Sequence, residues 1–236
     1  MKLVFVRHAE PDYAHDSLTK KGRREAEILS GRIAQMEVRD FYCSPLGRAK
    51  ETAAACLDKI GRQAVVCDWL REFPGYIMDE VTGKRRLPWD LMPRDWTKKP
   101  KLYDKDLWLT EPLMQTGNMK EVYDGICASM DGLLAEYGYR RDGGMYRTDG
   151  GNEDTVVFFC HLGITFAIVS HLIGLSPEVL WHGFFVAPTS VTTLVTEERI
   201  PGDVFFRCTG LGDISHLYQA GEPVSKSGLF EEMQMK

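Results

Sequence analysis

The sequence predicts an α/β protein, a three-layer sandwich in which helices cover both faces of a mostly parallel central sheet. Short apolar runs typical of buried strands alternate with amphipathic helical segments, and turn residues separate them. The 236 residues are enough to bury a full hydrophobic core. We therefore expect residues 1–236 to form one domain that carries an inserted segment.

The elements of the first third follow the strand–helix alternation. Residues 1–6 are short, apolar and partly β-branched, as in a buried parallel strand. The next expected elements are a helix over 17–36 that Ser17 can cap, a strand over 40–43, an alanine-rich helix over 47–60 that Gly61 closes, and a strand over 64–67.

The last half of the chain repeats this pattern. The expected elements are a helix over 119–139, a hairpin near the glycine pairs at 143–144 and 150–151, an apolar strand over 155–160, a helix over 163–173 that Gly174 ends, and strands over 191–196 and 204–208 joined by a turn at 200–203. This alternation implies mostly parallel strands with helices on both faces.

Residues 73–118 break the rhythm. They hold five prolines and three tryptophans and show no sustained periodicity. A long aromatic connection inside a compact domain is usually functional or mobile. The sequence leaves open whether these aromatic side chains pack on their own domain or on a second copy of the chain, so a homodimer is one of the alternatives.

Composition limits the classes of partner. A net charge of −5 argues against nucleic acid or an anionic membrane as the main partner, because both need a basic surface. No apolar run approaches transmembrane length, and the N-terminal one is too short for a signal peptide. Six scattered cysteines without a Cys-x-x-Cys spacing favour reduced thiols. We therefore expect a cytoplasmic enzyme.

The first strand runs directly into Arg7-His8-Ala9-Glu10. The carboxyl end of a parallel strand is where open α/β sheets bind ligands. Arginine matches the geometry of phosphate, and a neutral histidine can act as a nucleophile. Taken alone, this pair also fits an unremarkable basic surface. Four further blocks decide between the two interpretations: Leu18-Thr19-x-x-Gly22-x-x-x-Ala26, Ser44-Pro45-Leu46-Gly47-Arg48-Ala49-Lys50-Glu51-Thr52-Ala53, Leu70-Arg71-Glu72 and Cys160-His161-Leu162-Gly163.

In this order the blocks resemble the histidine phosphatase superfamily, also called the phosphoglycerate mutase-like family, over residues 1–72 and 153–217. The resemblance implies the α/β sandwich described above and an insertion at 73–118 that caps the active site and selects the substrate. It also implies catalysis through a phosphohistidine on His8, with the other ring nitrogen donating to a backbone carbonyl. Neither a metal nor a cofactor is expected, since the acids and histidines form no cluster typical of metal ligands.

The expected phosphate-binding residues are Arg7, Arg48 and His161, each just beyond a strand that ends at the same sheet edge. Their positive groups can neutralise the transferring phosphoryl group. Glu72 is the expected general acid, because a departing alkoxide needs a proton. Asp79 and Glu80 are rival candidates for this role.

Two residues depart from the family pattern, which has glycine where this chain has Ala9 and Leu162. Alanine is compatible with the chemistry if its φ is negative, whereas leucine adds bulk beside the phosphate and disfavours positive φ. Six aromatic or histidine side chains could line the leaving-group side, although each fits structural packing as well: Tyr13, His15, Tyr76, Trp89, Trp96 and Trp108. His171, His182 and His216 are interpreted as structural.

The predicted function is therefore a metal-independent phosphomonoesterase that acts on a small phosphate ester. A phosphoglycerate mutase-like transferase is the first alternative, but residues 11–14 depart from the longer first motif of such mutases. The second alternative is a phosphate-binding or regulatory module that has lost turnover, for which Ala9 and Leu162 would be the symptoms.

Overall fold

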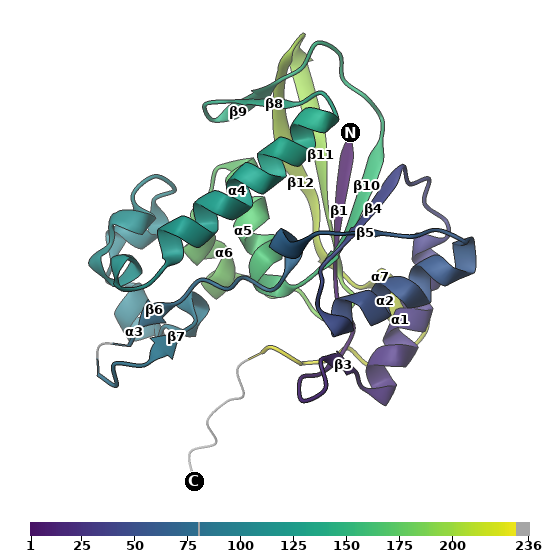
Figure 1. Ribbon diagram of the computed structural model, residues 1–236, viewed down its shortest axis with the longest axis horizontal. Coiled ribbons are helices and arrows are strands. Elements are labelled where there is room, and N and C mark those ends of the chain that lie inside the picture. Colours follow the sequence, from purple (N-terminus) through teal and green to yellow (C-terminus); the bar gives the residue numbers. More distant parts are fainter. Residues whose placement is uncertain (80, 230–236) are drawn as a thin grey trace.

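An eight-stranded sheet in the order β5-β4-β10-β1-β11-β12-β9-β8 forms the middle of the computed structural model, which describes residues 1–79 and 81–229 (Figure 1). The strands of this sheet are β1 (Lys2–Arg7), β4 (Asp40–Cys43), β5 (Val65–Val66), β8 (Arg140–Asp142), β9 (Met145–Arg147), β10 (Thr155–Cys160), β11 (Val191–Ile200) and β12 (Asp203–Asp213). Two small ribbons lie outside it, one of β2 (Pro11–Asp12) with β3 (Ser17–Leu18) and one of β6 (Ile77–Met78) with β7 (Arg85–Arg86).

The sheet has a parallel half and an antiparallel half. Strands β5, β4, β10 and β1 pair in parallel, so their carboxyl ends meet at one edge. Strand β11 pairs antiparallel with β1, and β12, β9 and β8 continue in the antiparallel sense. The α/β sandwich is confirmed, and its parallel half is the part that carries the predicted catalytic residues.

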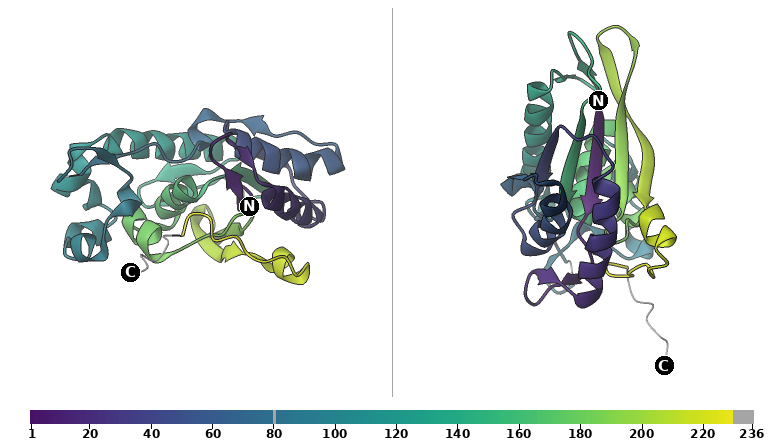
Figure 2. Two further views of the ribbon diagram at one scale, coloured as in Figure 1. Left: turned by 90° about the horizontal axis from the view of Figure 1, so that it is seen from below. Right: turned by 90° about the vertical axis from the view of Figure 1, so that its right-hand side faces the viewer.

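Helices cover both faces of the sheet. The helices are α1 (Lys20–Ile33), α2 (Gly47–Leu57), α3 (Pro93–Trp96), α4 (Met119–Glu136), α5 (Leu162–Ile173), α6 (Pro177–Gly183) and α7 (Ser215–Gln219). Apolar side chains of α1 and α2 pack on the face that Val4 and Phe159 present. Those of α4 and α5 pack on the opposite face with Phe5 and Phe158. The three layers can be followed in the rotated views of Figure 2.

The predicted element boundaries hold with some corrections. Helix α1 begins at Lys20, and Thr19 rather than Ser17 caps it, since its Oγ1 accepts a hydrogen bond of 3.0 Å from the Gly22 amide. Gly61 and Gly174 end their helices with φ of 62° and 70°, as glycine allows. The short helices α6 and α7 were not predicted, because seven and five residues are too few to show a clear helical periodicity.

Residues 73–118 contain only short elements and extend to one side of the sheet, at the lower left of Figure 1. Besides β6, β7 and α3 they form the 3-10 turns Pro88–Asp90, Pro100–Tyr103, Trp108–Thr110 and Pro112–Thr116. Two further 3-10 turns among the described residues precede the segment, at Asp58–Ile60 and Asp68–Leu70. Leu102 and Trp108 are buried in the same core as Phe5, so this segment packs on the domain.

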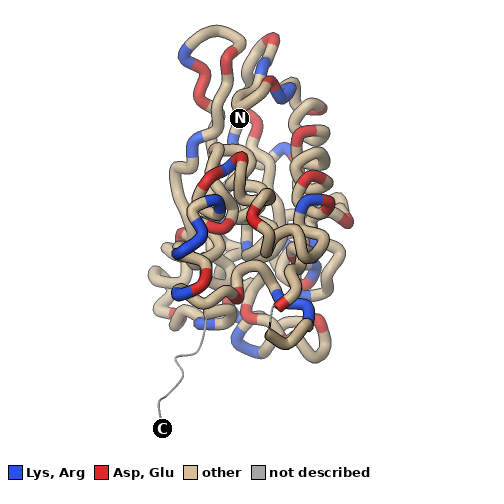
Figure 3. Tube along the Cα trace, turned by 90° about the vertical axis from the view of Figure 1, so that its left-hand side faces the viewer, with Lys and Arg blue, Asp and Glu red and all other residues tan. Residues whose placement is uncertain are grey.

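Acidic and basic residues intermingle along the chain on the side shown in Figure 3. Within the described residues, no helix is long and apolar enough to cross a membrane.

Candidate active site

The parallel strands bring the predicted histidines together at their carboxyl edge. Arg7 pairs with Cys160 in the register of β1 and β10, so His8 and His161 follow on adjacent strands. The His8 amide donates to the Cys160 carbonyl at 2.9 Å. The two imidazole rings lie 5.0 Å apart, centroid to centroid, and are tilted by 57°. Both side chains are almost wholly buried.

The ring of His8 is held in one tautomer. Its Nδ1 lies 2.8 Å from the carbonyl oxygen of Ala9, and a carbonyl can only accept a hydrogen bond. Nδ1 therefore carries the proton and Nε2 is left with a free lone pair. Burial, followed by the positive charge of Arg7, lowers the pKa of His8 to about 3. The imidazole is consequently neutral near pH 7, as a nucleophile must be.

His161 is oriented by Ser44, which follows β4. The Ser44 hydroxyl lies 2.7 Å from Nε2 of His161 and accepts a hydrogen bond from the Leu46 amide at 3.2 Å. Among the described residues, Nε2 is the acceptor that the proton of this buried hydroxyl can reach, so we assign that proton to Nε2 and the imidazole proton to Nδ1. Burial, with further contributions from His8, Arg48 and Arg7, lowers the pKa of His161 well below its usual value.

Arg7 is fixed by backbone carbonyls. Its Nη1 donates to Val186 at 2.6 Å, and its Nη2 donates to Ser227 at 2.9 Å. The second contact comes from the C-terminal segment, where a Cβ on Gly228 would lie 2.7 Å from Nη2. Each terminal nitrogen uses one N–H group in this way, and the buried Nε keeps its N–H group for a ligand.

Arg48, in the first turn of α2, is fixed by Asp16 from the loop between β2 and β3. Oδ1 of Asp16 accepts from Nη1 of Arg48, and Oδ2 accepts from the Gly47 amide, both at 2.6 Å. A Cβ on Gly47 would lie 2.1 Å from the Asp16 carbonyl oxygen, so this close approach requires glycine. Asp16 itself has a φ of 46°, which aspartate tolerates better than most residues.

Three buried donors of this cluster have no hydrogen-bond partner among the described residues: Nε of Arg7, Nε of Arg48 and Nδ1 of His161. Buried polar groups are nearly always paired, so each such atom needs an explanation. The three side chains are electrostatic neighbours, since both guanidinium groups lower the pKa of His161. An anion with several oxygens would satisfy all three donors, and phosphate is such an anion.

Glu72 lines the same cavity as Arg7 and Arg48. The amides of Phe73 and Ile164 donate to its Oε1 at 2.9 and 3.1 Å. Desolvation nevertheless raises the pKa of Glu72, outweighing these hydrogen bonds and the nearby arginines. Because amides occupy Oε1, a proton on this carboxyl is best placed on Oε2.

The rival acids differ from Glu72 in their surroundings. Asp79 accepts hydrogen bonds from Thr82 and pairs with Arg86 at 3.2 Å. The hydrogen bonds from Thr82 are the main reason that the pKa of Asp79 is lowered, so this carboxyl is ionised and has no proton to give near neutral pH. Glu80 lies outside the described residues.

The two departures from the family pattern cause no backbone strain. Ala9 and Leu162 are not among the residues with positive φ, and Leu162 opens α5 with helical geometry. The position that requires glycine at the start of α5 is the next one, Gly163. A Cβ on Gly163 would lie 2.6 Å from the Trp89 ring and 2.8 Å from Oε1 of Glu72.

A cavity of about 960 Å³ opens beside the arginines. Segment 73–118 contributes Leu87, Trp89, Leu91, Met92, Pro93 and Trp96 to its wall. Leu162, Trp181, His182, Phe184 and Phe185 complete this wall from α5, α6 and the loop that follows α6. Such a size and an apolar lining are typical of a small-molecule site.

The aromatic candidates from the sequence separate into two groups. Tyr13, Trp89 and Trp96 line the cavity. Of the others, Trp108 is buried in the core, His15 is exposed beside Asp12, and Tyr76 lies in a separate hollow. Two of the histidines interpreted as structural pair with polar groups away from this cavity, His171 with Asp131 and His216 with Thr189, whereas His182 is part of the cavity wall.

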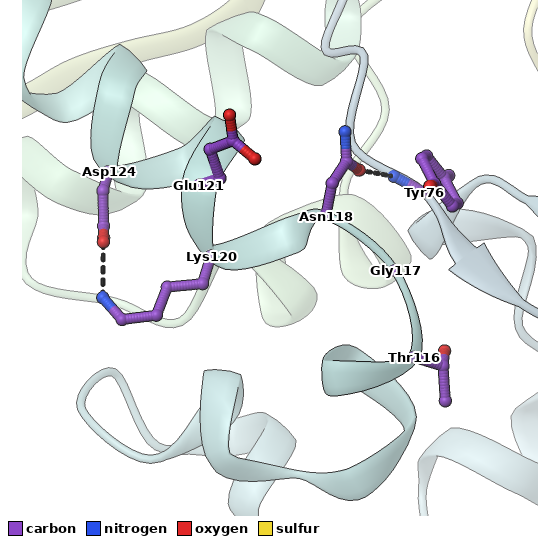
Figure 4. Close-up of a pocket in the computed structure, with 7 residues that line it drawn as sticks. All are labelled: Tyr76, Thr116, Gly117, Asn118, Lys120, Glu121 and Asp124. Carbon is purple, nitrogen blue, oxygen red and sulfur yellow. Dashed lines mark hydrogen bonds and ion pairs between the residues drawn. The ribbon is translucent and has the colours of Figure 1, made fainter.

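The separate hollow, about 510 Å³, lies where Gly117 leads into α4 (Figure 4). Two of its polar contacts are internal: Oδ1 of Asn118 accepts from the Tyr76 amide at 3.0 Å, and Lys120 pairs with Asp124. None of the residues that line it carries a buried donor without a partner, unlike the cluster around Arg7, among the described residues.

Sequence reasoning did not identify Asp16 or assign roles to Ser44 and Thr52. Thr52 donates to the Arg48 carbonyl at 2.8 Å and accepts from the Ala9 amide at 3.0 Å, which joins two of the motifs. The position of Thr52, four residues after Arg48 on a helix, could have predicted the bond to the Arg48 carbonyl. No sequence pattern predicts the contact of Asp16 with Arg48, because that contact depends on the path of a loop.

The chain is similar to several known proteins. The family model described as histidine phosphatase superfamily (branch 1) matches residues 3–105. The order of the motifs and the meeting of His8 with His161 at one edge of the sheet agree with this match. By this match and the order of its motifs, the chain is similar to the histidine phosphatase superfamily. A protein of Hydrogenobacter thermophilus named as a proposed phosphoserine phosphatase is 26% identical over 196 residues, covering 77% of this chain and 83% of that protein.

Two solved structures show the same fold. A phosphoserine phosphatase variant from Entamoeba histolytica, in complex with phosphoserine, has a TM-score of 0.62 at 19% identity and covers 92% of this chain and 98% of its own. A mycobacterial glucosyl-3-phosphoglycerate phosphatase has a TM-score of 0.60 at 18% identity, with coverages of 89% and 98%. A phosphoglycerate mutase of Thermoplasma acidophilum matches a shorter part, 29% identical over 72 residues, covering 26% of this chain and 36% of that protein. Family and relatives together indicate a phosphatase or mutase enzyme.

Proposed function

We propose that this protein is a metal-independent phosphomonoesterase that forms a phosphohistidine on His8. The observation that carries the proposal is the set of three buried, unpartnered donors on Arg7, Arg48 and His161, next to a neutral imidazole with a free Nε2. These donors can hold the phosphoryl oxygens and neutralise the charge of the transition state.

In the first step, Nε2 of His8 attacks phosphorus and the bond from phosphorus to the ester oxygen breaks. Glu72 gives its proton to that oxygen, so the product leaves as an alcohol rather than an alkoxide. In the second step, the Glu72 carboxylate takes a proton from water as the water oxygen attacks the phosphohistidine. Inorganic phosphate is released, and His8 and Glu72 return to their starting states.

Ala9 and Leu162 are the two residues that depart from the family pattern. Their backbone conformation favours an active enzyme rather than a regulatory module that has lost turnover. Neither Ala9 nor Leu162 has the positive φ that would distort the loops beside the histidines. The inserted segment 73–118 acts in this proposal as the cap, since it supplies one wall of the cavity that Arg7, Arg48 and Glu72 also line. The substrate class is a small phosphate ester.

The test is to mix the protein with a phosphomonoester carrying a labelled phosphoryl group, in the presence of a chelator. We expect label to appear transiently on the wild-type protein in an acid-labile, base-stable bond and to be released as inorganic phosphate. His8→Ala should lose both the bound label and turnover. Turnover by His8→Ala would refute the phosphohistidine, and loss of activity with the chelator would refute metal independence. Label that returns to substrate as an isomerised ester would indicate a mutase.

A further inference from the structure

The cavity beside the phosphate donors has an apolar wall. Leu87, Trp89, Met92 and Trp96 form it on the inserted segment, opposite Leu162 and Trp181. The charged lining residues are Arg7, Arg48 and Glu72, and all three belong to the proposed phosphoryl-transfer centre. Beyond that centre, the leaving group of a substrate would meet mainly indole rings and aliphatic side chains.

This wall is preformed and attached to the catalytic elements. The rings of Trp89 and Trp181 lie 5.6 Å apart, and Phe73 packs against Trp181 at 4.9 Å. Nε1 of Trp181 donates to the Gly163 carbonyl at 3.0 Å, two residues after His161. The one polar atom of that indole is therefore already engaged, and its ring stays in place without a ligand.

The titratable side chain on the wall is His182, and its Nε2 has no hydrogen-bond partner among the described residues. Nδ1 of His182 donates to the Glu178 carbonyl at 3.0 Å, and Trp96 stacks on its ring at 4.7 Å. Burial lowers the pKa of His182 and raises that of the adjoining Glu178 well above its usual value. Oε2 of Glu178, 3.4 Å from Nδ1, is thus part of a neutral pair.

A charged leaving group would lose hydration on this wall, and in the proposed function the two arginines of the cavity are already engaged with the phosphoryl group. An ammonium or carboxylate group placed against leucine and tryptophan carries a large desolvation cost. A quaternary ammonium could contact the rings, but Leu87, Met92 and Leu162 interrupt them and two guanidinium groups line the same cavity. An apolar leaving group meets none of these penalties.

We propose that the protein hydrolyses phosphomonoesters whose leaving group is a hydrophobic alcohol carrying an aromatic ring or an alkyl chain. This inference rests on the proposed function for its chemistry, and on the cavity wall for its selectivity. It sets the chain apart from relatives whose names specify phosphoserine and glucosyl-3-phosphoglycerate, both of which have charged groups beyond the phosphate.

The test compares esters that all release a primary alcohol: 3-phenylpropyl phosphate, propyl phosphate, phosphoserine and phosphocholine. Serine and choline are somewhat better leaving groups than the two unsubstituted alcohols, so reactivity alone would favour the charged substrates. We expect kcat/KM for 3-phenylpropyl phosphate to exceed that for propyl phosphate on the order of 100-fold, since each buried methylene contributes about fourfold. Phosphoserine and phosphocholine should not exceed propyl phosphate.

Substituting two exposed wall residues changes the contact with the leaving group without creating a cavity in the core. Leu87 is 41% exposed and Met92 is 40% exposed, so Leu87→Ser and Met92→Ser should fold normally. We expect the double variant to reduce the ratio of kcat/KM between 3-phenylpropyl and propyl phosphate by about three- to tenfold. Leu107→Ser is the matched control, because Leu107 is on the same segment, 47% exposed, and not part of the wall.

The outcomes separate this inference from the proposed function. Phosphate release with phosphoserine or phosphocholine preferred would overturn the inference and leave the phosphatase intact. If no ester is hydrolysed, p-nitrophenyl phosphate included, the proposed function fails. Calorimetry with His8→Ala then still compares binding of the 3-phenylpropyl and propyl esters. Equal affinities in that experiment would overturn the inference as well.

Discussion

Asp16 and Arg48 form an ion pair of 2.6 Å at the mouth of the phosphate site. The second oxygen of Asp16 holds the amide of Gly47, the first residue of α2, so one carboxylate fixes both the guanidinium group and the start of its helix. Burial opposes ionisation of Asp16, but the hydrogen bonds from Gly47 and Arg48 outweigh it and lower the pKa of the carboxyl. The pair leaves Nε of Arg48 unpartnered among the described residues.

From this geometry we predict that Asp16→Ala lowers kcat/KM by about 10- to 100-fold, because a misplaced phosphate donor stabilises the transition state poorly. Asp16→Asn keeps one acceptor oxygen and should recover part of the loss. Asp12→Ala is the matched control on the same small ribbon, since the carboxylate of Asp12 contacts the exposed Ala14 and His15. Steady-state kinetics and inhibition by inorganic phosphate measure the effect. Wild-type kinetics in Asp16→Ala would show that Arg48 needs no such partner.

Ser44 offers a second test of positioning. If its hydroxyl proton sets the tautomer of His161, Ser44→Ala should lower kcat about tenfold, because Nδ1 is then no longer reliably protonated. The nitrogen-15 shifts of the His161 ring should report a single Nδ1-protonated tautomer in the wild type and a mixture in Ser44→Ala. Ser30→Ala removes an equally buried hydroxyl from α1 and serves as the control. An unchanged ring spectrum in Ser44→Ala would contradict this role.

The sequence was sufficient to predict the main layers and the five residues proposed for catalysis and phosphate binding. His8 and His161 directly follow β1 and β10, so the meeting of these two histidines is a consequence of parallel pairing. The contacts of Asp16 and the cavity wall of Trp181 and His182 could not be predicted. They depend on loop paths and on packing between distant segments, for which the chain has no local periodicity.

The buried histidines predict how stability depends on pH. A histidine whose pKa is lower in the folded protein than in the unfolded chain takes up a proton on unfolding at pH values between the two. Stability from His8 is therefore complete above about pH 6.5 and is lost as the pH falls toward about 3. Each such group contributes about 1.4 kcal/mol per pH unit within this range.

We predict that His8→Asn reduces the slope of the unfolding free energy against pH by about 1.4 kcal/mol per pH unit between pH 4 and 6. His161, whose pKa is also lowered, keeps contributing in this variant, while the raised pKa of Glu72 acts in the opposite direction in both proteins. Urea denaturation at several pH values measures the difference. Parallel curves for the variant and the wild type would mean that His8 can be protonated in the folded protein.

The proton on Glu72 distinguishes the general acid from a carboxylate that merely lines the cavity. Glu72→Gln keeps the shape and the acceptor for the Phe73 and Ile164 amides but has no acidic proton. We expect kcat/KM for an alkyl phosphate to fall by about 10²- to 10⁴-fold. The loss for p-nitrophenyl phosphate should be less than about tenfold, because nitrophenolate leaves without protonation. Asp79→Asn should match the wild type with both substrates. An equal loss on both substrates in Glu72→Gln would remove Glu72 from the acid role and leave it as a residue that binds or orients the ester.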